Sequence, residues 1–588
     1  MKKLGAAALV VGLFSASCSG HGVTPSVPGG ASAPSDLGAG SSKSATVAAA
    51  PDGWSTTGTG AIALANATDL GALDASKPLT VRIGLQMRNA DQLKAAVASG
   101  QTVSPSAFAA TYAPTPDQVS AVTSYLQSQG FTNITVEPND LLISADGTAA
   151  KAQAAFDTTL KAFSVGGATV FANTAPAYVP TALHGIVLAV LGLNDAAKMA
   201  SKPQMTNCYV GGTGSLPCVR LDYDPQTFWK AYDVGTTPTG SRTTVAVMAE
   251  GDVAQTVSDL RTAEAAWKLP QVPVSVVQVG LPSPDTAGID EWDLDTQSST
   301  GIAGNVAHLF IYATTSMTDS DIALEYDKWV TQDVAQLGNS SFGICEAFPY
   351  VDGSMLVDDE ILLQGASQGQ TMFASTGDTG SSCGLAGTNG VPGSGPPLVE
   401  YPAASPYVVA VGGTTLLTNA DGSYLGEAAW NAGGGGVSQF EYSPYWESEA
   451  QPQSASTPVG GMPVTIRGLP DISMDADANT GGDVFVDGSE TVIGGTSLAS
   501  PLAMGVYARL QSAHRNSLGF GPIAFYDIYA QNPNATQTPA GPPPTELVGG
   551  FHDILTGSNG LYSALPRYDY TTGLGTFDVQ AIDASIGR

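Results

Sequence analysis

The sequence has few charged residues and very few basic ones. Of its 588 residues only 13% are charged, and 52 acidic side chains against 22 basic ones give a formal net charge of −30 at pH 7. A surface of this sign repels nucleic acids and anionic lipids, so we expect neither as a partner. The pI of about 4.2 is typical of a protein that is soluble at neutral pH or of one that tolerates acid, and composition leaves both interpretations open.

Long hydrophobic runs are absent except at the N-terminus. Two lysines there precede "LGAAALVVGLFSA", which has the length of a signal-peptide core and is too short to span a bilayer. We therefore predict a signal peptide over residues 1–18 and a protein that is secreted or held in the cell envelope. The ending "SASC" is similar to a bacterial lipoprotein processing site, although Ser15 stands where that pattern has leucine. A lipid anchor on Cys18 and plain secretion both remain open.

Cysteine is scarce as well. Apart from Cys18, the cysteines are Cys208, Cys218, Cys345 and Cys383. An even number in an exported chain predicts two disulfides, and the absence of a C-x-x-C pair argues against a zinc site. The sequence does not determine the pairing. Cys208 with Cys218 would close a modest loop, and so would the other two.

Composition changes along the chain predict its domain organisation. Residues 19–52 are rich in Gly, Ser, Ala and Pro, which is typical of a flexible linker. Residues 53–196 alternate strands and helices, as in a small α+β domain. A polar segment, 197–221, links them to residues 222–588, where buried strands such as "TTVAVMAE" and "YVVAVGG" alternate with helices. That pattern is typical of an α/β domain with a parallel sheet covered on both faces.

Two helices are predicted in the smaller domain. "TPDQVSAVTSYLQSQG" begins with the capping residue Thr115 and Pro116 and ends at Gly130. "TAAKAQAAFDTTLKAF" predicts a second helix over residues 148–163. With the strand pattern of "LTVRIGLQM" and "NDLLISADG", this indicates a small sheet covered by two helices.

Histidine, the usual general base of a serine enzyme, occurs only five times. This matters because "VIGGTSLASP" places Ser497 between a tight glycine turn and an apolar helix, a typical setting for a nucleophile. His308 opens an apolar strand and His514 lies several turns beyond Ser497. A Ser-His-Asp triad is not excluded, since its members need not be adjacent in sequence, but no pattern supports one.

A second serine competes for the role of nucleophile. "GASQG" matches the G-x-S-x-G elbow with Ser367 at its centre, and with His552 it would make a serine esterase. The elbow requires a strand before the serine and a helix after it. Here a helix is predicted before Ser367 and a strand after it, so the match does not favour an elbow.

Carboxylates supply another base. Glu291 and Asp295 in "GIDEWDLDTQSS" are four residues apart, so on a helix their Cβ atoms lie roughly 5–6 Å apart on one face. A solvated acidic helix start is the alternative interpretation. Because glutamate has a reference pKa of about 4.3, it is an effective base only in acid. Asp378, in "FASTGDTGSS" just after a strand, could donate to an oxyanion when protonated, or it could simply form a turn.

The order of several motifs resembles the sedolisins, or serine-carboxyl peptidases. These motifs are "EWDLDTQ", "SSFGICE", "FASTGDTG", "YPAASPYVVAVGGTTL", "WNAGGGGVS", "RGLPDISMDADANTG" and "GGTSLASP". The resemblance implies a subtilisin-like α/β fold with Ser497 as nucleophile, Glu291 as general base and acid, Asp295 orienting Glu291, and Asp378 as oxyanion donor. The smaller domain is similar to the family's activation domain, which implies an intramolecular inhibitor.

The same resemblance implies one structural calcium ion near the C-terminus, in "FHDILTGSNGLYSALPRYDYTTGLGTFD". Asp553 and Asp569 would supply carboxylates, and Ile554 and Arg567 backbone carbonyls. The family normally has glycine at two carbonyl positions, where this chain has Leu565 and Arg567. Carbonyl ligation needs no glycine unless the backbone requires positive φ.

We therefore interpret the sequence as that of an exported, acid-active endopeptidase, made as a precursor and processed by itself within residues 195–210. Protein or peptide substrates and a monomeric state are expected. The alternatives are a serine esterase based on Ser367 and an inactive binding protein on a peptidase fold. The presence of all four catalytic residue types argues against the inactive form.

Overall fold

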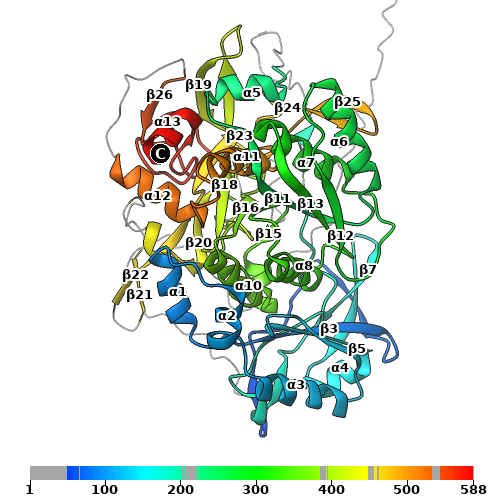
Figure 1. Cartoon of the computed structure of the whole chain (residues 1–588). Helices are drawn as coiled ribbons and strands as arrows, with labels where there is room; N and C mark the ends of the chain where they lie inside the picture. The colour runs from blue at the N-terminus through cyan, green and yellow to red at the C-terminus, as the bar shows by residue number, and fades with distance from the viewer. Residues whose placement is uncertain are drawn as a thin grey trace, which may run out of the picture.

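The computed structural model describes residues 50–586 apart from 65, 202–203, 206–220, 384–391, 394, 448–449, 451–455, 460–461 and 533–542. The predicted signal peptide, Cys18 and the pair Cys208 and Cys218 lie outside these residues. The N-terminal domain lies at one end of the molecule, below the larger domain in Figure 1. Among the described residues no helix has both the length and the apolar character needed to cross a membrane.

A four-stranded antiparallel sheet, in the order β4-β5-β3-β9, forms the N-terminal domain. Alternate residues of β3, including Val81 and Ile83, point into a core that α3 and α4 complete. The predicted start of α3 is confirmed. The Thr115 hydroxyl accepts a bond from the Gln118 amide, while the Gln118 side chain accepts one from the Thr115 amide, forming a capping box. The elements of this domain are β1 (Trp54–Thr56), β2 (Thr68–Ala72), β3 (Pro78–Leu85), α1 (Ala90–Ala98), α2 (Pro105–Thr111), α3 (Pro116–Ser128), β4 (Thr132–Val136), β5 (Leu142–Thr148), α4 (Ala149–Ala155), β6 (Leu160–Val165), β7 (Ala168–Asn173), β8 (Tyr178–Pro180) and β9 (Val187–Leu191).

The second predicted helix, 148–163, is wrong in its length. The helix α4 ends at Ala155, and the chain turns at Asp157, whose φ is +41°. Residues 160–165 instead form β6, which pairs with β2 and β7. The alanine-rich start favours a helix, but the pairing with two strands outweighs helix propensity in the second half.

A sheet of eight strands forms the centre of the larger domain. Its order is β12-β13-β11-β14-β16-β18-β19, and β23 pairs with β18; every pairing is parallel except that between β18 and β19. These strands are apolar and largely buried because helices cover the sheet. The predicted fold class, a parallel-sheet α/β domain after a small α+β domain, is confirmed. The strands are β11 (Gly240–Glu250), β12 (Val274–Gln278), β13 (Val306–Thr314), β14 (Leu337–Ser340), β16 (Thr371–Ser375), β18 (Val408–Thr418), β19 (Tyr424–Ala429) and β23 (Ile472–Asp475).

Two long helices, α7 and α11, pack against each other beside the sheet, while α8 and α10 lie between the sheet and the N-terminal domain (Figure 1). The helices are α5 (Pro225–Ala231), α6 (Ala254–Ala266), α7 (Ile289–Ala303), α8 (Asp319–Gln332), α9 (Ala347–Asp352), α10 (Ser354–Gln368), α11 (Thr496–Ala513), α12 (Gly521–Gln531) and α13 (Val579–Ile586). Short strands at the margins are β10 (Gln204–Met205), β15 (Ile344–Cys345), β17 (Glu400–Tyr401), β20 (Gly436–Tyr442), β21 (Ser456–Val459), β22 (Met462–Leu469), β24 (Gly482–Val486), β25 (Ser489–Gly494), β26 (Thr545–Val548), β27 (Phe551–Ile554) and β28 (Thr576–Phe577).

The two domains meet through a close-packed and partly ionic interface. A Cβ on Gly84 of β3 would come within 2.4 Å of the Val357 side chain, so only glycine fits there without a shift. Arg82, on the same strand, forms a buried ion pair of 2.7 Å with Asp321 of α8. The Asn139 amide donates to the carboxylate of Asp327 at 2.7 Å. The N-terminal domain is therefore held on α8 and α10.

Candidate active site

Ser497 lies in the first turn of α11, at the end of a glycine turn. Gly495 has φ +108°, and a Cβ there would lie 2.6 Å from Asp378 Oδ2, so both conformation and space require glycine. The Ser497 side chain is almost buried, and its Oγ donates a long hydrogen bond of 3.5 Å to the Ser341 carbonyl. The hydroxyl is thereby held at the positive end of the helix dipole, where a developing oxyanion is favoured.

Asp378 follows β16 and caps α11. Its Oδ1 accepts bonds from the backbone amide and the hydroxyl of Thr496, each at 2.8 Å. The Thr496 hydroxyl in turn accepts a bond of 3.0 Å from the Gly377 amide. Because Thr496 precedes Ser497, these bonds bring the Asp378 carboxyl next to the serine.

Glu291 and Asp295 lie one turn apart on α7, and both are fully buried. Burial raises the pKa of Glu291 well above its usual value, and the charges of Asp295, Asp290 and Asp378 raise it further. Interaction with the Ser497 hydroxyl lowers that pKa, which makes the two side chains neighbours. In this structure the Ser497 hydroxyl donates to the Ser341 carbonyl, so a small rotation of the side chain is needed to bring its proton to Glu291. Burial also raises the pKa of Asp295. The alternative interpretation of a solvated helix start is wrong, because the packing of α7 against α11 removes both groups from water.

The four predicted catalytic residues thus converge from three segments: α7, the loop after β16 and the start of α11. A cavity of about 10 Å³, room for about one water molecule, lies beside the serine. It is lined by Ala200, Ser341, Gly343, Ser375, Gly377, Asp378, Glu400, Thr496 and Ser497. No histidine is among these lining residues, so the neighbours of the serine that can titrate are carboxyl groups.

Described residues of the segment after the N-terminal domain lie beside this cavity, and Ala200 lines it. Ala200 pairs with Gly343 in antiparallel fashion, through amide-to-carbonyl bonds of 2.9 and 3.2 Å, and the Met199 amide donates to the Met317 carbonyl. Farther along, β10 pairs antiparallel with β25, Gln204 lying opposite Gly494. The described parts of the segment therefore form an isolated bridge at Gly343 and a short strand on β25, in the manner in which an extended peptide binds an edge.

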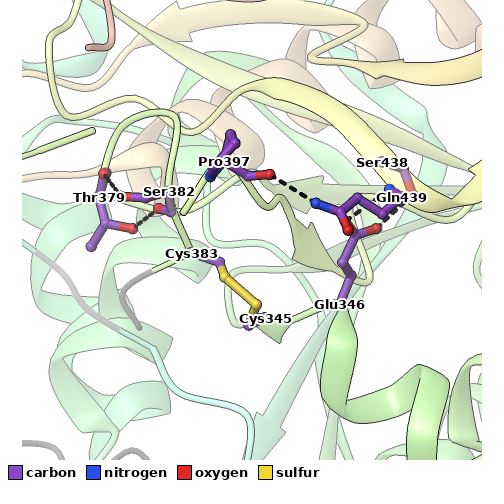
Figure 2. Close-up of a disulfide and its surroundings, with 8 residues drawn as sticks. All are labelled: Cys345, Glu346, Thr379, Ser382, Cys383, Pro397, Ser438 and Gln439. Carbon is purple, nitrogen blue, oxygen red and sulfur yellow. Dashed lines mark hydrogen bonds between the residues drawn. A yellow bond between two sulfur atoms is a disulfide. The ribbon is translucent and has the colours of Figure 1, made fainter. Parts of the chain in front are cut away.

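A disulfide between Cys345 and Cys383 joins two walls of the site, one of the pairings that the sequence left open. Cys383 lies five residues beyond Asp378, and Cys345 lies four beyond Ser341. Figure 2 shows that the adjacent Glu346 carboxylate accepts bonds from the Ser438 hydroxyl and the Gln439 amide. The Asp378 loop is thereby tied to β15, which directly follows Gly343, the residue that pairs with Ala200.

Several residues of the site were missed by sequence reasoning. Ser341, Asn339 and Ser500 are fully buried and form a chain of hydrogen bonds that ends on Asp295. The position of Asn339 and Ser341 at and just after the end of β14, a strand next to β16, was a usable signal, because functional side chains gather at the carboxyl ends of parallel strands. Ser500, on α11, gave no such signal, and neither did Glu400 or Thr496.

The alternative esterase site is not assembled. Ser367 is buried near the end of α10, before β16, and its hydroxyl donates to the Gln364 carbonyl of its own helix at 2.7 Å. His552 is stacked on Tyr424 in β19, and burial lowers its pKa to about 3. Neither side chain is placed as the hypothesis of an elbow nucleophile with a histidine base requires.

The predicted calcium loop contains oxygen donors of the right chemistry. Asp553 and Asp569 are buried, and burial, with a small addition from the charge of Asp569, raises the pKa of Asp553 to about 6. Arg567 has φ +74°, a conformation that favours the glycine of related loops. Its guanidinium lies 3.2 Å from Asp553 and 3.6 Å from Glu546. The loop keeps an excess of negative charge that suits a cation, although Arg567 already neutralises part of it.

Comparison with known proteins agrees with this geometry. Residues 65–196 match the family model "Pro-kumamolisin, activation domain", and residues 287–526 match the subtilase family. The chain is 36% identical to sedolisin of Pseudomonas sp. (strain 101), with 89% of each chain covered. It is 35% identical to xanthomonalisin of Xanthomonas sp. (strain T-22), over 86% of this chain and 65% of that protein.

Among solved structures, Pseudomonas sedolisin, a serine-carboxyl proteinase complexed with pseudo-iodotyrostatin, has a TM-score of 0.56 and 36% identity, with 62% of this chain and 98% of that one covered. The fold and the relatives define a serine-carboxyl peptidase with a subtilisin-like catalytic domain behind an activation domain. The chain belongs to the sedolisin family.

Proposed function

We propose that this serine-carboxyl peptidase is an exported, acid-active endopeptidase that is made as a precursor and matures by cutting its own chain. The observation that carries the proposal is the convergence of Ser497, Glu291, Asp295 and Asp378 in one buried site whose cavity is lined without histidine. Its substrates are proteins or peptides that bind as extended strands. Glu291 is the general base, and Asp295 orients it.

The proposed chemistry passes one proton back and forth. Glu291 removes the proton from Ser497 Oγ as that oxygen attacks the peptide carbonyl carbon, and it then gives the proton to the departing amine. The C–N bond breaks and an ester on Ser497 remains. Glu291 next takes a proton from water, the hydroxide attacks the ester, and the proton returns to Ser497 as the acid product leaves.

Asp378 stabilises the intermediate as the oxyanion donor. Oδ1 already accepts two bonds from Thr496, so a proton on this carboxyl belongs on Oδ2. From there it can be donated to the oxyanion, which an ionised carboxylate cannot do. Both the protonated Asp378 carboxyl and the Glu291 base are suited to acid. At higher pH Asp378 loses its proton and can no longer donate to the oxyanion.

Processing in the segment between the domains follows from its course. Ala200 lines the cavity with Ser497 and pairs with Gly343, so the cut falls in the residues just beyond it, within the predicted 195–210 segment. Cleavage leaves the N-terminal domain attached only through its interface, which includes the Arg82 to Asp321 ion pair.

Calcium is proposed as a structural ion, held by the carboxylates of Asp553 and Asp569 and the carbonyls of Ile554 and Arg567. Calcium prefers oxygen ligands of this kind. The ion would stabilise the C-terminal loop and would take no part in the chemistry. Export, with either a free or a lipid-modified Cys18, rests on the N-terminal sequence, and the mass of the N-terminal peptide of the uncleaved Ser497→Ala precursor in the culture fractions tests it.

The central test compares the wild-type precursor with the Ser497→Ala variant. Each is shifted from pH 7 to values between 3 and 6, and processing and hydrolysis of a denatured protein are followed by gel and mass spectrometry. We expect both activities in acid for the wild type and neither for the variant. Processing and hydrolysis by Ser497→Ala would refute the proposal, and loss of both in Ser367→Ala alone would favour the esterase.

A further inference from the structure

A chain of buried side chains behind the site donates its hydrogen bonds in one direction, from Ser500 to Asp295. The Ser500 hydroxyl donates to Asn339 Oδ1 at 2.7 Å, the Asn339 amide donates to Ser341 Oγ at 2.9 Å, and the Ser341 hydroxyl donates to Asp295 Oδ1 at 2.6 Å. The side chains of Ser500, Asn339 and Ser341 are fully buried. No water competes for these bonds, so their direction is set by the protein.

Each member of the chain has a defined task. A hydroxyl has a single hydrogen to donate, and Ser341 has two acceptors within reach, Asp295 Oδ1 at 2.6 Å and the Ser497 carbonyl at 3.4 Å. The shorter contact takes the hydrogen. Because Asn339 donates to Ser341 and accepts from Ser500, its amide is held with the nitrogen toward Ser341, which keeps the hydrogen of Ser341 for Asp295.

We propose that Ser341, supported by Asn339 and Ser500, is a positioning residue whose hydroxyl keeps Asp295 Oδ1 occupied as a hydrogen-bond acceptor. A proton shared between Asp295 and Glu291 is then restricted to Asp295 Oδ2. This inference rests on the function proposed for Glu291 and Ser497. Among the described residues, Asp295 Oδ2 accepts no hydrogen bond. The charge of Asp295 raises the pKa of Glu291, one turn away on α7, so in the proposal Oδ2 is the oxygen that shares a proton with Glu291. A proton exchanged between the two carboxyls then travels along one path only.

The bond from Ser341 also sets the pH range of the pair. A donor to a carboxylate favours its ionised form, and both Ser341 and Asn339 lower the pKa of Asp295 against the effect of burial. The other charged groups that act on the pair are Asp290, on the same helix, and Asp378, after β16; both raise the pKa of Glu291. Loss of the Ser341 hydroxyl should therefore move the acid limb of activity to higher pH.

The test is the pH profile of Ser341→Ala. A hydrogen bond to a charged group corresponds to about 10- to 100-fold in rate, so we expect kcat to fall by that factor with little change in KM. The apparent pKa of the acid limb should rise by about one unit. Ser341→Thr, which keeps a hydroxyl, should restore the profile. Asn339→Asp, of the same size, should shift it, because its carboxylate competes for the hydrogen of Ser341.

Ser340→Ala is the matched control. The neighbouring Ser340 is also fully buried, but its hydroxyl bonds to Tyr326 at 2.9 Å, away from the carboxyl pair. The Ser340→Ala variant should have a lower unfolding temperature than the wild type but the same pH profile of activity. If a variant matures too slowly to yield mature enzyme for the steady-state assay, the single-turnover rate of precursor cleavage against pH replaces that assay, and thermal unfolding verifies its fold.

Two failures are distinguishable. A wild type without hydrolysis dependent on Ser497 overturns the proposed function, and with it the basis of this inference. A wild type that hydrolyses peptides, with Ser341→Ala giving the same profile as Ser340→Ala, overturns the inference alone. An equal shift in Ser340→Ala would also overturn it, because the effect would then come from packing.

Discussion

Replacement of Asp378 separates its two roles. In the structure Asp378 caps α11 through two bonds from Thr496 to Oδ1, and in the proposed mechanism it donates to the oxyanion from Oδ2. Asp378→Ala removes both roles. Asp378→Asn keeps an oxygen that can accept from Thr496 and adds an amide N–H that can donate at any pH.

The expected magnitudes differ for the two roles. Loss of one oxyanion donor costs about 10²- to 10³-fold in rate, or about 2.7–4 kcal/mol. Loss of a helix cap costs about 0.5–2 kcal/mol in the free energy of unfolding. Asp378→Ala should therefore show both losses. Asp378→Asn should keep most of the stability, cleave faster than Asp378→Ala, and lose less of its relative rate as the pH rises, because its donor does not ionise.

The assay uses the precursor, since its maturation is itself a single turnover of the reaction. The fraction cleaved is followed on gels after transfer to pH values from 3 to 6, and the unfolding temperature is measured for each variant. If Asp378→Ala were less stable yet matured at the wild-type rate, Asp378 would be only a helix cap. The same rate and pH dependence in Asp378→Asn and Asp378→Ala would refute the donor argument.

Three further predictions concern stability and maturation. Burial raises the pKa of Asp327 to about 8 in the folded protein, whereas the pKa of an aspartate in the unfolded chain is about 4. The contribution of Asp327 to stability is therefore complete below about pH 4 and is lost as the pH rises through about 8. The unfolding temperature of an uncleaved Ser497→Ala precursor should rise from pH 8 to pH 5, and it should rise less when Asp327→Asn is added. Arg82→Ala removes the cation from a buried ion pair and leaves Asp321 with the bond from the Ser316 hydroxyl, which should weaken docking of the prodomain by about 3 kcal/mol, seen as less prodomain retained on the cleaved enzyme in gel filtration at pH 6. Calcium should raise the unfolding temperature and a chelator lower it, and the calcium affinity measured by calorimetry should be higher in Arg567→Gly, which removes the competing cation and suits the positive φ; no response to calcium in either protein would refute the site.

Local patterns predicted those parts of the fold that depend on neighbouring residues. Thr115 and Pro116 marked the start of α3 because capping is decided within four residues. The spacing of Glu291 and Asp295 predicted a shared helix face for the same reason. The second helix failed after Ala155 because strand pairing with β7, set by residues farther along the chain, decided the conformation.

Contacts between distant segments could not be predicted in this way. Ser341 contacts Asp295 across 46 positions of sequence, and Ser500 contacts Asn339 across 161. The end of a parallel strand marked the place of Asn339 and Ser341, but serine and asparagine are common, so no local pattern identified their partners. The burial of Glu291 has the same origin, because it depends on the packing of α7 against α11.

Burial of the carboxyl pair explains how the site can work without a histidine base. An exposed glutamate has a pKa near 4.3 and would be a weak base at any pH where it is ionised. Burial and the charge of Asp295 raise the pKa of Glu291, which makes it a stronger base, while the bond from Ser341 opposes the increase for Asp295. The working pH is thus set by a balance between burial and donated hydrogen bonds, and changing Ser341 should move that pH without altering any group that touches the substrate's reacting carbonyl.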